Sequence, residues 1–172
     1  TDISFHEDKC FGEQKTRRMN ARDVKFSFER ICDARVKSTG LWIFRNRLVG
    51  AEEFNKATSQ NQQMDGISGI TVINDSTVQL RLEKPFAPLL SLLTMPYCWI
   101  IPHEATDFYK TDFYKHPIGT GAFMFKEWQP DLALTLERNP HYFKHDASGK
   151  QLPYLDGVSI SFMRNTKAEF LE

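Results

Sequence analysis

The pattern of apolar and polar positions begins with one well-marked helix. Its apolar residues, spaced i, i+4 and i+7 on one helical face, are Val24, Phe28 and Ile31. Asn20 precedes them, and its side-chain oxygen can accept a hydrogen bond from an unpaired N–H of the first turn. Asp23 follows three residues later, where a carboxylate favours the positive end of a helix. The pattern predicts a helix over Ala21–Cys32.

Alternation of apolar and polar residues, the period of a half-buried strand, indicates two β-hairpins. The first covers 70–83 and turns at 74–76 (NDS), a turn-forming sequence. The second covers 123–138 and turns at 129–131 (QPD). The alternating residues of one further strand are Val158, Ile160 and Phe162. Together with the helices, these hairpins predict a mixed α+β fold.

The remaining elements are shorter. Three more helices are predicted, over 51–57, 85–93 and 103–109. The apolar run 97–101 lies between two prolines and predicts a short buried strand, whereas the pattern leaves the type of 41–49 open. Thr166 is placed to cap a helix that continues to Glu172. Because Thr1 opens in the middle of a pattern and the chain closes inside this helix, we expect a piece of a longer protein.

Composition changes this picture mainly by exclusion. The chain has 172 residues, with 22 Lys plus Arg balanced by 22 Asp plus Glu. A neutral chain gives no electrostatic reason to expect nucleic acid or an anionic membrane surface as a partner. Hydrophobic residues make up 41% and charged residues 26%, which are ordinary values for a globular domain. Aromatic residues reach 13%, and their rings supply both core volume and stacking surfaces.

The cysteines and histidines do not form a recognisable chemical site. The chain has an odd number of cysteines, Cys10, Cys32 and Cys98, and none of them form a C-x-x-C motif. Neither a disulfide framework nor a zinc ribbon is therefore indicated. Cys98 lies in an apolar run with no basic neighbour to lower its pKa, which argues against a catalytic thiolate. His141 and His145 are four residues apart, but no third ligand follows at a matching spacing.

Other candidate motifs also favour structural roles. The sequence Gly-Thr-Gly at 119–121 lacks the Lys-Ser/Thr of a nucleotide loop and leads into a strand, which favours a tight crossover. Glu52 and Glu53 are adjacent and would point to different helix faces, so they do not form an acid–base pair. No G-x-S-x-G pattern occurs. The residues predict no catalytic site, no metal and no cofactor.

A series of short motifs runs through the chain in a specific order. They are FH (5–6), MNARDVKFSFER (19–30), VGAEEF (49–54), INDSTV (73–78), LEKPFAP (82–88), PIGTGAF (117–123), LERNPHYF (136–143) and LPYLD (152–156). The second resembles the signature T-A-x-D-V-x-F-S-x-x-R, and PIGTGAF resembles P-V-G-T-G-P-F. Both signatures belong to the peptide-binding family, family 5, of extracytoplasmic solute-binding proteins of ABC transporters. The segment 10–18 departs from that family, because it is longer than the usual short turn.

The resemblance implies a fold and a division into parts. Family members have two lobes that close on a ligand, and this chain resembles only part of the first lobe of a type II periplasmic-binding-protein-like fold. Residues 1–115 would form the smaller hairpin-and-helix subdomain, and 116–172 an incomplete segment of the main mixed sheet. The second lobe would be absent. The resemblance also implies a binding protein and not an enzyme.

The implied role is capture of a peptide, or another small solute, and its delivery to ABC permease subunits. The protein would be periplasmic or otherwise extracytoplasmic, either free or anchored as a lipoprotein, and would meet the membrane only through that anchor or the permease. One alternative stays open, a solute-responsive sensor or interaction module that presents the same lobe to a protein partner. A hydrolase would need a nucleophile that the sequence does not show.

The resemblance also implies ligand-binding positions. In relatives, side chains from the segments matching 41–45 and 97–99 reach the cleft between the lobes. Here these segments offer Trp42, Phe44, Tyr97, Cys98 and Trp99. Simple core packing is the alternative for each of them. With the second lobe missing, we expect the bare aromatic wall to make this chain prone to self-association.

Overall fold

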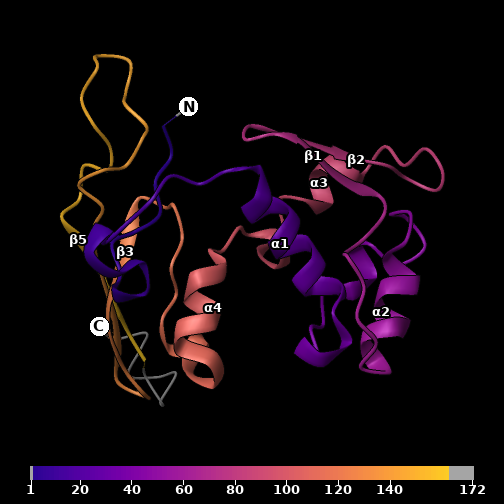
Figure 1. Ribbon diagram of the computed structural model, residues 1–172. Helices are drawn as coiled ribbons and strands as arrows, with labels where there is room; N and C mark the ends of the chain where they lie inside the picture. The colour runs from indigo at the N-terminus through magenta and orange to yellow at the C-terminus, as the bar shows by residue number, and fades with distance from the viewer. Residues whose placement is uncertain (1, 163–172) are drawn as a thin grey trace, which may run out of the picture. The chain divides into compact units, whose positions relative to one another are not determined.

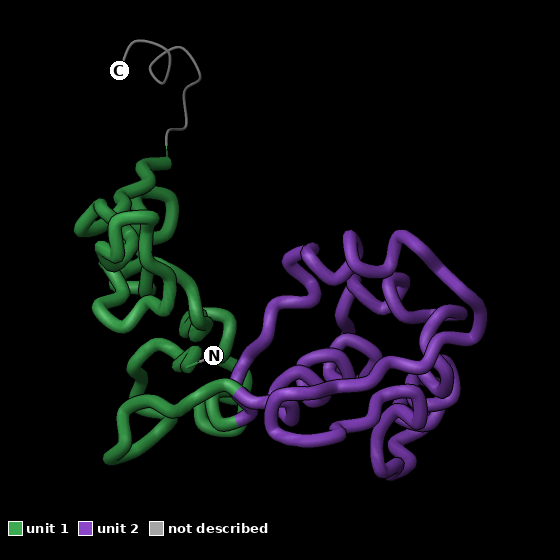
Figure 2. The backbone as a smooth tube through the Cα atoms, turned by 90° about the horizontal axis from the view of Figure 1, so that it is seen from above, with its two compact units in different colours: residues 1–19, 104–172 green, residues 20–103 purple. Residues whose placement is uncertain are grey.

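The computed structural model describes residues 2–162. By its internal contacts the chain divides into two compact units (Figure 2). One unit is 20–103, and the other combines 1–19 with 104–172. The boundary predicted at residue 115 therefore falls inside the second unit, and how the parent lobe divides into subdomains stays a prediction. The helix expected after Thr166 lies outside the described residues.

The unit 20–103 is built around helix α1, Ala21–Cys32, which has the predicted bounds (Figure 1). The Arg22 backbone N–H donates to Asn20 Oδ1 at 2.8 Å, and the Asn20 N–H donates to Asp23 Oδ2 at 2.8 Å. The Asn20 side chain also accepts from the backbone of Asp23, and this bond together with the Asn20–Asp23 bond forms a reciprocal capping box, which confirms the predicted helix start. The cap satisfies backbone groups that the first turn cannot pair within the helix.

The other elements of this unit surround α1. They are the 3₁₀ turns Ala34–Val36, Leu41–Ile43 and Pro96–Cys98, helices α2 (Ala51–Ser59) and α3 (Leu89–Leu92), and strands β1 (Ile70–Asn74) and β2 (Thr77–Leu80). The two strands form the predicted antiparallel hairpin, with Ile70 opposite Leu80. Helix α3 is shorter than the predicted 85–93, because Pro88 lies at its N-cap and only four residues follow in helical pairing.

The strand predicted over 97–101 is wrong. The segment begins with the 3₁₀ turn Pro96–Cys98, in which proline occupies the first helical position and the Cys98 N–H donates to the Met95 carbonyl at 2.9 Å. Proline suits this position because its fixed φ matches a helical turn and it has no N–H to leave unpaired. A short apolar run predicts burial but does not separate a strand from a turn.

One hydrophobic core holds the unit 20–103 together. Its buried members are Phe28, Ile31, Cys32, Ile43, Phe44, Leu48, Ala51, Phe54, Ile67, Ile70 and Cys98. The rings of Phe28 and Phe44 lie with centroids 5.0 Å apart, so they join α1 to the segment that follows the turn Leu41–Ile43. Partly buried leucines of the hairpin and of α3, such as Leu80 and Leu92, pack against this core.

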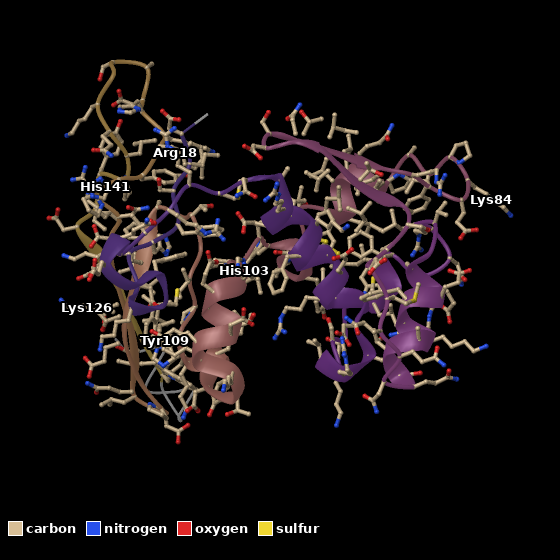
Figure 3. The ribbon with its side chains drawn as sticks, viewed as in Figure 1. Arg18, Lys84, His103, Tyr109, Lys126 and His141 are labelled. Carbon is tan, nitrogen blue, oxygen red and sulfur yellow. The ribbon has the colours of Figure 1, made fainter. Side chains whose placement is uncertain are left out.

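The second unit contains the three-stranded antiparallel sheet. Its elements are the 3₁₀ segments Lys9–Gln14 and Lys110–Lys115, helix α4 (His103–Tyr109, whose first residue belongs to the other unit), and strands β3 (Phe123–Gln129), β4 (Ala133–Arg138) and β5 (Gly157–Ser161). The strand order is β3-β4-β5, so the predicted hairpin and last strand are confirmed. Tyr109 lies at the end of α4 (Figure 3), and its hydroxyl donates to the Asp8 carboxylate at 2.9 and 3.0 Å.

A β-bulge changes which side chains share a face of β3. The register pairs Phe125 with Leu136 and Trp128 with Leu134, which leaves one extra residue, Lys126, on β3. Because one extra residue reverses the alternation, Phe125 and Trp128 fall on the same face although they are three apart. An open cavity of about 330 Å³ lies over this face, and its lining residues are Tyr114, Lys115, Pro117, Phe125, Trp128, Leu134 and Phe162.

His6 holds the loop that precedes β3. Its backbone N–H donates to the Gly119 carbonyl at 2.8 Å, and its ring Nε2 donates to the Gly121 carbonyl at 2.9 Å. Asn139 Nδ2 donates to the same Gly121 oxygen at 2.9 Å. The second ring nitrogen of His6, Nδ1, is buried and has no hydrogen-bond partner. Burial therefore lowers the pKa of His6, because a charged ring would be poorly solvated there.

This environment predicts a loss of stability at mildly acidic pH. In the unfolded chain a histidine titrates near pH 6.5, and in the folded chain His6 titrates lower. The unfolded state therefore binds more protons, so the stabilising effect of neutral His6 is complete above about pH 6.5 and declines as the pH falls toward the folded pKa. Urea unfolding of the wild type and of His6→Gln should give different slopes of stability against pH, steeper for the wild type.

The matched control is His145→Gln. His145 is exposed and contacts Gln151 through a backbone bridge, and its substitution should leave the slope of the wild type unchanged. Equal pH slopes for the wild type and His6→Gln would contradict the assignment of this titration to His6.

Candidate ligand-binding surface

The five predicted ligand-binding residues lie in two segments of the unit 20–103. The structure divides them by burial. Trp42, Tyr97 and Trp99 expose 44%, 41% and 67% of their surface, whereas Phe44 exposes 0% and Cys98 4%. The first three therefore offer side-chain surface to a ligand, and the other two do not in this conformation. That any of them contacts a ligand stays a prediction.

Phe44 and Cys98 belong to the core. Phe44 packs against Phe28, and Cys98 belongs to the same cluster as Cys32. Burial raises the pKa of the Cys98 thiol to about 11, so the sulfur is protonated at neutral pH. Burial likewise raises the pKa of the Cys32 thiol to about 12. Neither sulfur is the thiolate that nucleophilic chemistry requires.

The exposed rings lie next to buried residues in the chain. In the segment 96–99 the exposed Tyr97 and Trp99 flank the buried Cys98, and the Trp99 N–H donates to the Pro96 carbonyl at 3.2 Å. Trp42 immediately precedes the fully buried Ile43. Each exposed ring is therefore tied to a backbone position that the core holds in place.

The arginines beside Trp42 are already engaged within the unit. Arg45 Nε donates to Glu52 Oε2 at 2.7 Å. The Arg47 guanidinium donates to the Trp42 carbonyl and lies 4.8 Å from the centroid of the Phe86 ring. The candidate surface therefore offers aromatic and apolar contacts, whereas the side chains of Arg45 and Arg47 bind neighbouring groups of the same unit.

Sequence reasoning missed two small residues at this surface. Thr39 Oγ1 donates to the Tyr97 hydroxyl at 3.4 Å, and Gly40 lies directly beneath the Tyr97 ring. The only signal in the sequence was a glycine that closes a polar loop before an apolar segment. Neither residue has a motif that would mark it, because their role depends on a neighbour almost 60 positions away.

The structure shows no other chemical centre in the described part of the chain. Between residues 2 and 162, no three His, Cys, Asp or Glu side chains gather in a way that could hold a metal ion. His145 forms an isolated β-bridge with Gln151. Within the same residues, none of the helices has the length and apolar character needed to cross a membrane.

Comparison with known protein families identifies the family of the chain. The family model described as "Bacterial extracellular solute-binding proteins, family 5 Middle" matches residues 2–171. The chain belongs to this family. The dipeptide-binding protein of Escherichia coli K12 is a family 5 relative, 31% identical over 139 residues, which cover 77% of this chain and 24% of the relative. Di/tripeptide-binding protein 1 of Pseudomonas aeruginosa is 31% identical over 149 residues, 84% of this chain and 26% of the relative.

Solved structures of family 5 proteins confirm the predicted fold. DppA of Helicobacter pylori, in complex with the peptide STSA, has a TM-score of 0.71 and 24% identity and covers 98% of this chain. AgaA of A. tumefacien R10, in complex with agropinic acid, has a TM-score of 0.71 and 25% identity and covers 99%. The matches take up 31% and 28% of those chains. This chain thus has the mixed α+β fold of part of a family 5 protein and spans about a quarter of the curated relatives.

Membership also settles two expectations from the sequence. The predicted resemblance to the peptide-binding family is confirmed. Family 5 consists of solute-binding proteins, so the expectation of a binding protein instead of an enzyme is confirmed as well.

The division by burial predicts that two aromatic substitutions affect stability to very different extents. Phe44→Ala should lower the free energy of unfolding by about 3–5 kcal/mol, because it leaves a cavity in the core. Trp99→Ala should change it by no more than about 0.5–1 kcal/mol, because most of that ring is already in water. Urea unfolding followed by circular dichroism measures both. Phe44→Leu is the conservative control, and equal losses at positions 44 and 99 would contradict the burial assignment.

Proposed function

We propose that the full-length protein containing this chain captures a peptide, or another small solute, and delivers it to an ABC permease. The observation that carries the proposal is the family match over 2–171, together with 31% identity to a dipeptide-binding protein. The chain covers a quarter of that relative, so the ligand and the partners belong to the longer protein. The proposed site of action is outside the cytoplasmic membrane, in keeping with the family's extracellular description.

The exposed rings suit a ligand that is partly apolar and variable. Trp42, Tyr97 and Trp99 are flat, stiff surfaces that can stack on planar peptide groups or on apolar side chains. Such contacts select shape and apolar area, and they tolerate different side chains. The relatives differ in their ligands: one is a di/tripeptide-binding protein, and two solved structures are complexes with agropinic acid and with mannopinic acid. The proposed ligand class is accordingly a peptide or another small solute of similar size.

Mass spectrometry of the full-length protein, purified without denaturation, tests this function directly. The protein should release a small solute when it is unfolded, and peptides should dominate the released material. Calorimetry with synthetic peptides of the released composition should then show saturable binding. A preparation that releases no small molecule and binds none of a mixed peptide library would contradict the proposal, and so would turnover of peptides by the pure protein.

The 172-residue chain alone should bind peptides weakly. High affinity requires a second wall that removes the ligand from water and supplies partners for its charged termini. With one wall, those termini remain solvated, and a solvent-exposed ion pair contributes only about 0–1 kcal/mol. We expect a Kd no tighter than about 1 mM, which corresponds to about −4 kcal/mol. Calorimetry of this chain beside the full-length protein measures the difference, and a micromolar site on the chain alone would show that the binding surface lies elsewhere.

The chain should also self-associate through its exposed rings. Trp42 and Trp99 present apolar area to water, and contact between two copies would remove part of it. Sedimentation velocity should show concentration-dependent dimers that the double substitution Trp42→Ser/Trp99→Ser reduces. The control is substitution of Trp128, an exposed ring in the other unit. If Trp128→Ser reduced dimer formation equally, the dimer contact would not lie at Trp42 and Trp99.

A further inference from the structure

We propose that Gly40 is a positioning residue that sets the place of the Tyr97 ring at the candidate ligand-binding surface. The inference rests on the proposed function, since it assigns Gly40 a role in presenting one wall of the binding site. It depends on a close approach between two chain segments, 38–43 and 96–98, both within the unit 20–103.

The backbone at position 40 does not itself require glycine. Gly40 has φ −85° and ψ −4°, in the right-handed helical region that every residue can adopt. Gly50, by contrast, has φ 83°, where a side chain would be strained. An alanine at position 40 would therefore keep the local conformation, and the reason for glycine has to be found in the space around it.

That space is filled by Tyr97. A Cβ atom added to Gly40 would lie 2.8 Å from Cδ1 and Cγ of Tyr97 and 2.9 Å from its Cβ. These separations are well below the ordinary contact distance between carbon atoms, which is about 3.5–4.0 Å. Rotation of the tyrosine about its Cα–Cβ bond would move the ring atoms but would leave the Tyr97 Cβ where it is. Relief of the contact therefore requires the two backbone segments to move apart.

Both segments are held against such movement. On one side, Cys98 is buried in the core, and its N–H donates to the Met95 carbonyl at 2.9 Å. On the other, the Ile43 N–H donates to the Gly40 carbonyl at 3.0 Å, and the Ile43 side chain is fully buried. A well-packed interior transmits a displacement of this kind instead of absorbing it. A methyl group at position 40 would thus shift Tyr97 relative to the segment 41–43, which carries Trp42.

The arrangement supports the ring without covering it. One face of Tyr97 rests on Gly40, its hydroxyl lies 3.4 Å from Thr39 Oγ1, and 41% of the residue remains exposed. A ring fixed before the ligand arrives needs less ordering when the ligand binds. The absence of a side chain at position 40 therefore sets both the depth at which the ring lies and its rigidity.

A cycle of variants in the 172-residue chain tests the contact without any ligand. Gly40→Ala should reduce the ratio of folded to unfolded protein by roughly ten- to a hundredfold, as overpacking substitutions do. The reduction should become smaller in a Tyr97→Ala background, which keeps Cβ, and should vanish in a Tyr97→Gly background, which removes all three contacting atoms. Gly119→Ala is the matched control, because an added Cβ there meets no atom within 4 Å. An equal effect of Gly40→Ala in all three backgrounds would overturn the inference.

The second arm measures binding by the full-length protein, with the dipeptides Ala-Ala and Phe-Phe as probes. Gly40→Ala should weaken binding of at least one dipeptide by roughly tenfold or more, whereas Tyr97→Phe, which keeps the ring in place, should stay within about threefold. Unchanged affinities for both dipeptides in Gly40→Ala would overturn the positioning role and leave the proposed function standing. A wild type that binds neither dipeptide and no member of a mixed peptide library would overturn the assignment of peptides as ligand, while the stability cycle would still decide whether Gly40 sets the place of Tyr97.

Discussion

The contact between Phe28 and Phe44 is the interaction on which the candidate surface depends. It joins helix α1 to the segment that carries Trp42, with 5.0 Å between the ring centroids. Cys98 belongs to the same core and anchors the second segment, on which Tyr97 and Trp99 lie. Each exposed ring is thus within two residues of a buried one. The burial of apolar area that stabilises the fold also holds the exposed rings in place.

This coupling addresses a conflict that every solute-binding protein meets. Bare aromatic area favours collapse or association in water, yet a binding wall has to remain open until its ligand arrives. A ring at the end of a flexible loop would fold back onto the protein. Here the turn Pro96–Cys98 leaves Tyr97 exposed while its last residue, Cys98, is buried, so the core fixes the backbone from which the Tyr97 ring projects. Core packing therefore limits how far the backbone beneath the candidate surface can move.

Local signals in the sequence predicted the elements well and the packing poorly. The helix Ala21–Cys32 could be predicted because its cap and its apolar spacing lie within twelve residues of each other. The segment 97–101 could not, because short apolar runs fit a turn as well as a strand. Phe44 and Trp99 are both aromatic residues in short apolar segments, and the sequence does not distinguish them, although Phe44 is buried and Trp99 is exposed. The bulge at Lys126 and the support of Tyr97 by Gly40 depend on distant partners, which no local pattern reveals.

The comparison with solved structures bears on how such a fold can serve different ligands. DppA in complex with a peptide and AgaA in complex with agropinic acid share the fold of this chain at the same TM-score. A fold that stays constant while ligands change has to place its selectivity where substitution does not disturb the core. Exposed positions such as Trp42 and Trp99 meet that condition, because a new side chain there alters the surface and leaves the packing intact. Gly40 differs from them: it is a packing position whose volume acts on the surface, so even a single methyl group there would change both stability and the shape offered to a ligand.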